Sequence, residues 1–280
     1  MKVILAENSG FCFGVKKAID TAFNEVEAKN EHKLYTLGPL IHNPQVVEEL
    51  KQKGIDVIED LEEVHSGNVI IRSHGVPEKI YREAEEKGII LTDSTCPFVS
   101  RIQKIVKEYY DKGYQIAIIG DPNHPEVIGI NGWCNDDGVI LQKTENIEKL
   151  KEDKPTCVVV QTTMSLVLYE EFIELIKHKI SDLQIFNTIC LATRKRQDAA
   201  RKLSKEVDAM IVIGGYHSSN TQKLVTICKE EKPNDTFHIE TVDEIDFEIL
   251  KKYETIGITA GASTPHKVVN EVLEKIKNLL

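Results

Sequence analysis

The chain has 280 residues, 41% of them hydrophobic and 29% charged, a composition typical of a globular protein that can bury a core. Its net charge of −10 argues against broad nucleic-acid binding, so no nucleic-acid partner is expected. The apolar runs are short and charges interrupt the amino end, so neither a secretory signal nor a membrane span is predicted. We therefore expect a cytoplasmic protein with reduced cysteines, which favours metal-bound or catalytic roles over disulfides.

The first predicted elements set a pattern of strand, cysteine turn and helix. Residues 2–23 read as an apolar strand, a turn that carries Cys12 and an amphipathic helix. Three more strands are predicted within residues 33–50, 56–60 and 68–80. The second and fourth strands of this set end in polar tips with His42 and His74, whereas the third leads into an acidic helical stretch.

The same order of elements recurs twice more, within residues 88–168 and 183–268. The equivalent polar positions, in chain order, are Cys96, His124, Glu126, Thr162, Cys190, Ser218, Ser219, Asn220 and Ser263. Short Val/Ile-rich runs that alternate with helical patterns are typical of parallel sheets covered by helices. The sequence therefore predicts an α/β fold of three similar lobes, each a small parallel sheet with flanking helices, around a pseudo-threefold axis. The lobes are predicted as residues 1–90, 91–182 and 183–280.

The polar tips lie where ligands bind in such folds, beyond the carboxyl ends of the strands. Several tips are followed by a proline at the expected first helical position, namely Pro44, Pro125 and Pro265. Helix amino termini offer unpaired N–H groups and a partial positive charge. If the lobes turn these ends inward, three cysteines converge beside a site for a phosphate-like anion.

Only three of the six cysteines recur at an equivalent repeat position, and these are Cys12, Cys96 and Cys190. A lone cysteine is usually a small apolar filler, and this interpretation is kept for the others, Cys134, Cys157 and Cys228. His217 and His266 stand beside the tips without an assigned role.

Three thiolates allow two kinds of metal centre. With one histidine they could complete a closed, structural zinc site. Alternatively, they could hold an iron–sulfur cluster and leave one iron without a protein ligand. The lack of closely spaced cysteine pairs and the many polar tips favour the cluster. Glu126, the only carboxylate in the tips, is either a proton donor or a first-turn acid favoured by the helix dipole.

The assembled motifs resemble one known family. They are GFCFGVKKA, LGPLIHNPQVV, RSHGVP, DSTCPFVSRI, NHPEVIG, QTTMS, TICLATRKRQ, SSNTQKL and TAGASTP, in that order from Cys12 to Pro265. The set is similar to the 4-hydroxy-3-methylbut-2-enyl diphosphate reductase family, which implies a three-lobed α/β enzyme with a central [4Fe-4S] cluster. It also implies the last step of the non-mevalonate isoprenoid route, where reductive dehydroxylation of the (E)-allylic diphosphate gives isopentenyl and dimethylallyl diphosphate.

The resemblance also implies roles for single residues. Cys12, Cys96 and Cys190 would bind the cluster, Glu126 would deliver protons, and Thr162 would lie near the substrate hydroxyl. The implied diphosphate-binding residues are His42, His74, His124, Ser218, Ser219, Asn220 and Ser263. The small-molecule substrate would be joined by a one-electron donor protein such as ferredoxin or flavodoxin. The chain departs from the family pattern at His217, and the run Arg194–Arg196 is more basic than expected, although Arg196-Gln197 fits the pattern.

Two other classes of protein compete with this interpretation. A non-enzymatic iron–sulfur sensor would keep the three cysteines but would need neither Glu126 nor three anion-binding tips. A zinc-stapled protein that binds a sugar phosphate or nucleotide is the second alternative, although the sequence has no Walker or GxGxxG loop.

Overall fold

The computed structural model of the chain describes residues 1–28 and 33–278. Contacts divide the chain into two compact units. The first unit comprises residues 1–15, 42–46 and 191–280, and the second comprises residues 16–41 and 47–190. Helices α1 (Phe13–Glu27) and α2 (Pro44–Gln52) begin in the first unit and continue in the second.

The first unit holds one four-stranded parallel sheet in the order β1-β12-β10-β11. Its strands are β1 (Lys2–Leu5), β10 (Ala209–Ile213), β11 (Thr236–Ile239) and β12 (Thr255–Ala260). Its further helices are α7 (Leu191–Glu206), α8 (Ser219–Glu231), η4 (Val242–Glu244), α9 (Phe247–Leu250) and α10 (His266–Lys277). Buried apolar clusters cover both faces of this sheet, so β10 is buried along its whole length.

The second unit holds two parallel sheets, in the orders β3-β2-β4-β5 and β7-β6-β8-β9. The first has strands β2 (Leu34–Leu37), β3 (Ile55–Ile58), β4 (Asn68–Ile71) and β5 (Ile90–Asp93), with η1 (Leu61–Glu63) and α3 (Glu78–Lys87). The second has strands β6 (Gln115–Ile119), β7 (Val139–Leu141), β8 (Thr156–Val160) and β9 (Leu183–Ile185). The helices beside it are α4 (Pro97–Asp111), α5 (Pro125–Asn131), η2 (Gly132–Cys134), η3 (Thr144–Lys149) and α6 (Leu166–Lys179).

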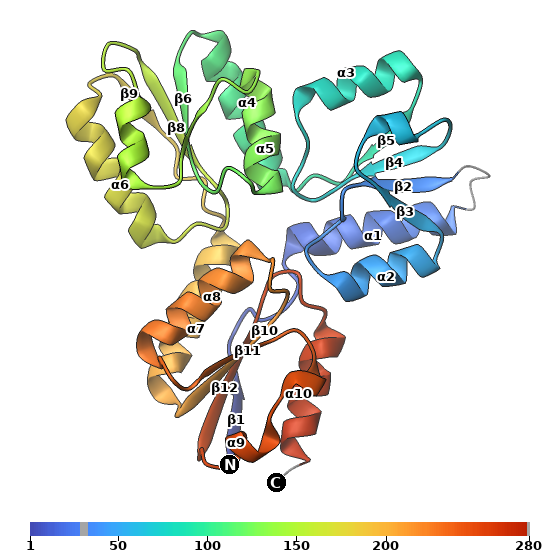
Figure 1. Cartoon of the computed structure of the whole chain (residues 1–280), viewed down its shortest axis with the longest axis vertical. Helices are drawn as coiled ribbons and strands as arrows, with labels where there is room; N and C mark the ends of the chain where they lie inside the picture. The colour runs from blue at the N-terminus through green and yellow to red at the C-terminus, as the bar shows by residue number, and fades with distance from the viewer. Residues whose placement is uncertain (29–32, 279–280) are drawn as a thin grey trace. The chain divides into compact units, whose positions relative to one another are not determined.

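All three sheets in the described residues share one strand order, so the predicted α/β fold with three small parallel sheets and flanking helices is confirmed. In each sheet the strand that precedes a cysteine lies at one edge, beside the fourth strand of the repeat before it. The last repeat takes its edge strand from the amino end of the chain: Lys2 of β1 pairs with Thr255 of β12, and Leu5 with Ile258. Figure 1 shows this blue first strand beside the red β12.

The lobe bounds 1–90, 91–182 and 183–280 stay a prediction. In each sheet, the strand that leads to a cysteine pairs with the fourth strand of another repeat: β5 pairs with β4, β9 with β8, and β1 with β12. Each sheet therefore includes a strand that leads to a cysteine, and in the sheet with β10, β11 and β12 this strand is β1.

The acidic helical stretches expected after the third strands are present as short 3₁₀ segments, of which the first begins with a capping box between Asp60 and Glu63. One local expectation is corrected. Helix α10 begins at His266, one residue later than expected, because Pro265 is its N-cap and accepts a hydrogen bond from the Val269 N–H through its carbonyl.

Candidate functional site

Each recurring cysteine lies immediately before a helix. Cys12 precedes α1, Cys96 is the N-cap of α4, and Cys190 precedes α7. All three are half-buried, and no disulfide joins any two cysteines of the chain. The Cys12 Sγ accepts a hydrogen bond from the Val15 N–H at 3.5 Å, as an N-cap side chain does. A helix amino terminus favours an anionic group, which suits a thiolate that ligates a metal.

In the second unit, two of the cysteines are tied by backbone contacts to the tips of neighbouring strands. The Cys96 N–H donates to the Ser73 carbonyl at 3.0 Å, and Ser73 directly precedes His74. The Cys190 N–H donates to the Thr162 carbonyl at 3.2 Å. Both cysteines are therefore fixed beside predicted site residues by backbone groups, so these contacts do not depend on rotamers.

His74 and His124 meet in the second unit although they follow strands of different sheets. Their rings lie 5.4 Å apart, centroid to centroid, in an edge-to-face arrangement. Gly129 of α5 allows this approach, because a Cβ at that position would lie only 3.2 Å from the Gly75 carbonyl oxygen. Gly75 itself has φ = 70°, a conformation that favours glycine directly after His74.

The start of α5 fixes the tautomer of His124. Its Nδ1 accepts a hydrogen bond from the Glu126 N–H at 3.1 Å, which caps the helix. A nitrogen that accepts carries no hydrogen, so the neutral ring is protonated on Nε2. The His124 side chain can thus donate to an anion from Nε2 while Nδ1 holds the helix.

Glu126 and Thr162 are joined by two short hydrogen bonds in the second unit. The Glu126 carboxylate accepts one hydrogen bond from the Thr162 N–H and another from the Thr162 hydroxyl, each at 2.6 Å. Only 2% of Glu126 is exposed. Burial raises the pKa of the Glu126 carboxyl above its ordinary value, and the two hydrogen bonds from Thr162 offset this only in part. The carboxyl group therefore keeps its proton to a higher pH than an exposed glutamate does.

A continuous run of contacts consequently links six predicted site residues of the second unit. It passes through Cys96, His74, His124, Glu126, Thr162 and Cys190, with Ser73 between the first two.

The first unit gathers a second set of predicted residues around the loop after β12. The Cys12 N–H donates to the Ala262 carbonyl at 3.1 Å. The next residue, Ser263, donates its hydroxyl to the His42 carbonyl at 3.0 Å. Cys12, Ser263 and His42 are therefore neighbours within this unit.

The Ser218–Asn220 tip lies at the same end of the first unit's sheet, after the carboxyl end of β10. A Cβ on Gly215 would be 3.1 Å from the His42 carbonyl oxygen and 3.9 Å from the Ser218 Cβ, which places the tip beside His42. Ser218 caps α8 by accepting a hydrogen bond from the Thr221 N–H. The Asn220 side chain is buried, yet neither its oxygen nor its nitrogen has a hydrogen-bond partner. A buried amide without partners is costly, so this tip suits a polar ligand.

Comparison with known proteins identifies the family. The family model described as "LytB protein" matches residues 3–277. The chain belongs to the LytB protein family. At 58% identity over 279 residues, covering 100% of both chains, it is similar to the 4-hydroxy-3-methylbut-2-enyl diphosphate reductase of Alkaliphilus oremlandii. A relative of the same name from Caldanaerobacter subterraneus is 54% identical, with 100% of this chain and 98% of the relative covered.

Solved structures agree with this assignment to the LytB family. The E-1-hydroxy-2-methyl-but-2-enyl-4-diphosphate reductase from Plasmodium falciparum matches with a TM-score of 0.93 at 30% identity, over 99% of this chain and 88% of that one. A (E)-4-hydroxy-3-methyl-but-2-enyl diphosphate reductase, titled the terminal enzyme of the non-mevalonate pathway, matches with a TM-score of 0.73 at 40% identity. That match covers 99% of this chain and 100% of the solved one. The family resemblance expected from the motifs is confirmed.

The other three cysteines differ in their surroundings from Cys12, Cys96 and Cys190. Cys134, Cys157 and Cys228 are wholly buried in apolar clusters. Burial raises the pKa of Cys134 and Cys157 to about 12 and that of Cys228 to about 11. These thiols stay protonated near neutral pH, which suits packing and not metal ligation.

Two contacts at the site were not anticipated from the sequence. The Ser73 carbonyl accepts a hydrogen bond from the Cys96 N–H, and the Arg196 side chain donates to the Gly10 carbonyl at 2.7 Å. A backbone carbonyl leaves no signal in the residue type, and the basic run Arg194–Arg196 does not indicate which of its side chains is buried. His217 is exposed and stays without an assigned role.

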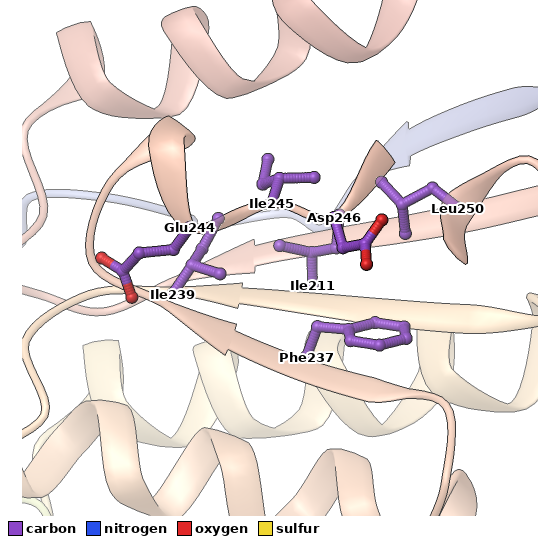
Figure 2. A pocket seen from close by; sticks show the side chains of 7 residues that line it. All are labelled: Ile211, Phe237, Ile239, Glu244, Ile245, Asp246 and Leu250. Atoms are coloured by element: carbon purple, nitrogen blue, oxygen red, sulfur yellow. The ribbon is translucent and has the colours of Figure 1, made fainter. Parts of the chain in front are cut away.

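A cavity of about 30 Å³ in the first unit lies apart from the predicted site residues, and none of them lines it. Figure 2 shows mainly aliphatic side chains around it, with Phe237 on one side and Ile245 on the other. The carboxylate of Glu244, at its edge, accepts a hydrogen bond from the Tyr216 hydroxyl. The small size of this cavity and its mainly aliphatic lining offer little to a polar ligand.

Across the described residues, no helix is both long and apolar enough to cross a membrane.

Proposed function

We propose that this LytB-family chain reduces (E)-4-hydroxy-3-methylbut-2-enyl diphosphate to isopentenyl and dimethylallyl diphosphate. The reaction takes up two electrons and two protons, breaks the allylic C–O bond and releases water. The observation that carries the proposal is the buried Glu126–Thr162 pair, at which a proton can be held beside a departing hydroxyl. High identity to relatives named for this activity supports the same choice.

The three recurring cysteines fit an iron–sulfur cluster. Cys12, Cys96 and Cys190 are half-buried at helix starts, whereas the other cysteines are held as thiols in the core. We propose that these three hold a [4Fe-4S] cluster, which when bound supplies single electrons and an iron position open to the substrate oxygen.

The proton for the leaving oxygen is delivered by the chain's own residues. When Glu126 is protonated on Oε2, this oxygen donates to the Thr162 hydroxyl, and the Thr162 hydrogen is then free to turn towards the substrate hydroxyl. Transfer along this pair gives the leaving oxygen its proton and leaves a carboxylate that the Thr162 N–H continues to stabilise. The near-complete burial of Glu126 excludes bulk water from this path.

The remaining predicted residues suit diphosphate binding. In the second unit, His124 offers Nε2–H and His74 lies beside it. In the first unit the set comprises His42, Ser218, Ser219, Asn220 and Ser263, of which Ser218 caps α8 at its amino terminus. Neutral donors and helix termini of this kind bind phosphate oxygens without a cluster of lysines. Such local groups can hold an anion even though the chain carries a net charge of −10.

A one-electron donor protein such as ferredoxin or flavodoxin is proposed as the partner, because the reaction consumes electrons and the chain contains no nicotinamide-binding GxGxxG loop. A cytoplasmic location is proposed from the reduced state expected for the cysteines.

The test compares three proteins, reconstituted without air and supplied with reduced methyl viologen and substrate. They are the parent chain, Glu126→Gln and the control Glu170→Gln, which alters an exposed glutamate of the same sheet's helix. The proposal expects both diphosphate products from the parent and the control, and little from Glu126→Gln. A parent that binds iron and sulfide but forms neither product would instead favour the iron–sulfur sensor.

A further inference from the structure

Arg196 is a buried cation in the second turn of α7. Only 2% of it is exposed, although it follows two exposed basic residues, Arg194 and Lys195. Its Nη2 donates a hydrogen bond to the Gly10 carbonyl at 2.7 Å. Burying a guanidinium is costly, and the hydrogen bond to the Gly10 carbonyl offsets part of that cost. The contact joins α7 to the turn that carries Cys12, entirely within the first unit.

The Cys12 turn has little freedom of its own. Gly10 has φ = 88°, and a Cβ there would lie 3.1 Å from the His266 ring. The Gly10 N–H donates to the Ala260 carbonyl, and the Cys12 N–H to the Ala262 carbonyl. The end of β12 and the loop after it thus accept hydrogen bonds from the N–H groups of Gly10 and Cys12, while Arg196 donates to the Gly10 carbonyl.

The second unit repeats this arrangement. Gln103 is buried in α4, the helix that begins after Cys96, and its Nε2 donates to the Val76 carbonyl at 3.4 Å. A Cβ on the preceding Gly75 would lie 2.4 Å from that Nε2. In both units a helix that begins after a cysteine uses a buried polar side chain to hold a glycine turn next to a site residue. The recurrence in both units supports a role for these contacts in positioning the neighbouring predicted site residues.

We propose that Arg196 is a positioning residue that holds the Cys12 thiol in place for ligation. This inference rests on the proposed role of Cys12 as a cluster ligand. Without the guanidinium, the Gly10 carbonyl loses its partner and the turn can move away from the start of α1. Cys12 would then lose its fixed position while Cys96 and Cys190, held by other backbone contacts, keep theirs.

The test uses the full chain in three variants. Arg196→Gln removes the charge and shortens the side chain, and Arg196→Lys keeps a donor with charge. Arg201→Gln is the matched control, because this arginine lies on the same helix but pairs with Glu230 at the surface, with an N–O distance of 2.7 Å. For the cluster-free chain, the alkylation rate of each cysteine is measured by mass spectrometry. Iron per chain is measured after reconstitution, and the urea midpoint reports global stability.

The proposal expects Arg196→Gln to raise the alkylation rate of Cys12 several-fold, with the rate of Cys96 unchanged as the internal reference. Iron retained per chain should fall in Arg196→Gln and recover in part in Arg196→Lys, while Arg201→Gln should match the parent. Equal rises at Cys12 and Cys96 together with a lower urea midpoint would overturn the proposal, since they indicate a role in global stability alone. Unchanged Cys12 alkylation would overturn it as well.

A second variant keeps the proposal testable if Arg196→Gln does not fold. Gly10→Ala retains Arg196 but adds a Cβ where the His266 ring lies, and thereby moves the same turn. It should also raise the alkylation rate of Cys12 selectively, and no change there would contradict the inference. If the parent chain binds no cluster, the proposed function fails, whereas the alkylation rates still decide whether Arg196 holds the turn.

Discussion

At the scale of single residues, Glu126 is a buried acid whose ionised form costs stability. Its carboxyl group is buried and hydrogen-bonded to Thr162, and burial raises its pKa. A raised pKa means that the folded state favours the protonated acid. The associated stability is present below the unfolded pKa and is lost as the pH rises through the folded value. The ionised carboxylate that remains above that pH destabilises the fold.

Glu126→Gln should therefore separate activity from stability. The amide keeps the shape and can still accept from the Thr162 N–H, but it carries no acidic proton. Turnover should fall by about 10²–10⁴-fold, the usual contribution of a positioned acid. The thermal midpoint near neutral pH should stay equal to that of the parent or rise. A variant that unfolds at a lower temperature would contradict this account of the carboxyl group.

The pH dependence of the parent carries the same information. Turnover should decline as the pH rises through the raised pKa of Glu126, because the proton-donating form disappears. The rates of the parent and of Glu126→Gln, measured from pH 5 to 9 at saturating substrate, test this expectation. A parent profile that is flat or rises over the whole range would contradict a protonated Glu126 as the donor.

His124 should govern substrate binding more than chemistry. Replacement by Asn keeps a capping side chain at the start of α5 but removes the Nε2–H donor. A hydrogen bond to a charged group contributes about 1.5–3 kcal/mol, so KM should rise by roughly 10- to 100-fold. The exposed His178 supplies the control, since His178→Asn should leave KM unchanged. A fall in kcat with constant KM would assign His124 to the chemical step instead.

At the scale of elements, helix α5 depends on close backbone contact. Gly129 faces the Gly75 carbonyl, and an added Cβ would lie at 3.2 Å. Gly129→Ala should lower the free energy of unfolding by about 1–3 kcal/mol, as overpacking does, and should weaken substrate binding because His74 and His124 move apart. Urea denaturation and KM measure the two effects. Ile128→Ala alters an exposed neighbour on the same helix and should change both far less.

The order of the secondary-structure elements was the feature that the sequence predicted most completely. The strand–cysteine–helix order and the polar tips could be predicted, because strand length, turn residues and capping signals are local. The sequence of the basic run did not show which of its residues would face the core: Arg194 and Lys195 of α7 are exposed, whereas Arg196 is buried. The acidic helical stretches after the third strands were predicted, but acidic composition does not show that they are short 3₁₀ segments.

At the scale of the whole molecule, the pairing of β1 with β12 had no local signal. It joins residues about 250 positions apart, and strand register is set by tertiary packing rather than by the residues of one strand. The repeat itself was detectable because each sheet uses the same order of elements. The LytB assignment, the sheets and the motif residues therefore agree, while the role of each site residue stays a prediction to be tested by substitution.

Cys12, Cys96 and Cys190 are proposed to hold a cluster with an iron open to the substrate hydroxyl. Iron and sulfide analysis of the chain purified without air, combined with Mössbauer spectra before and after addition of the diphosphate substrate, tests this proposal. We expect about four iron and four sulfide per chain, with the signal of one iron changed by substrate. Conversion of Cys157 to alanine should leave these values intact, whereas Cys96→Ser should not. Zinc, or no metal after careful reconstitution, would show that the three cysteines do not hold such a cluster.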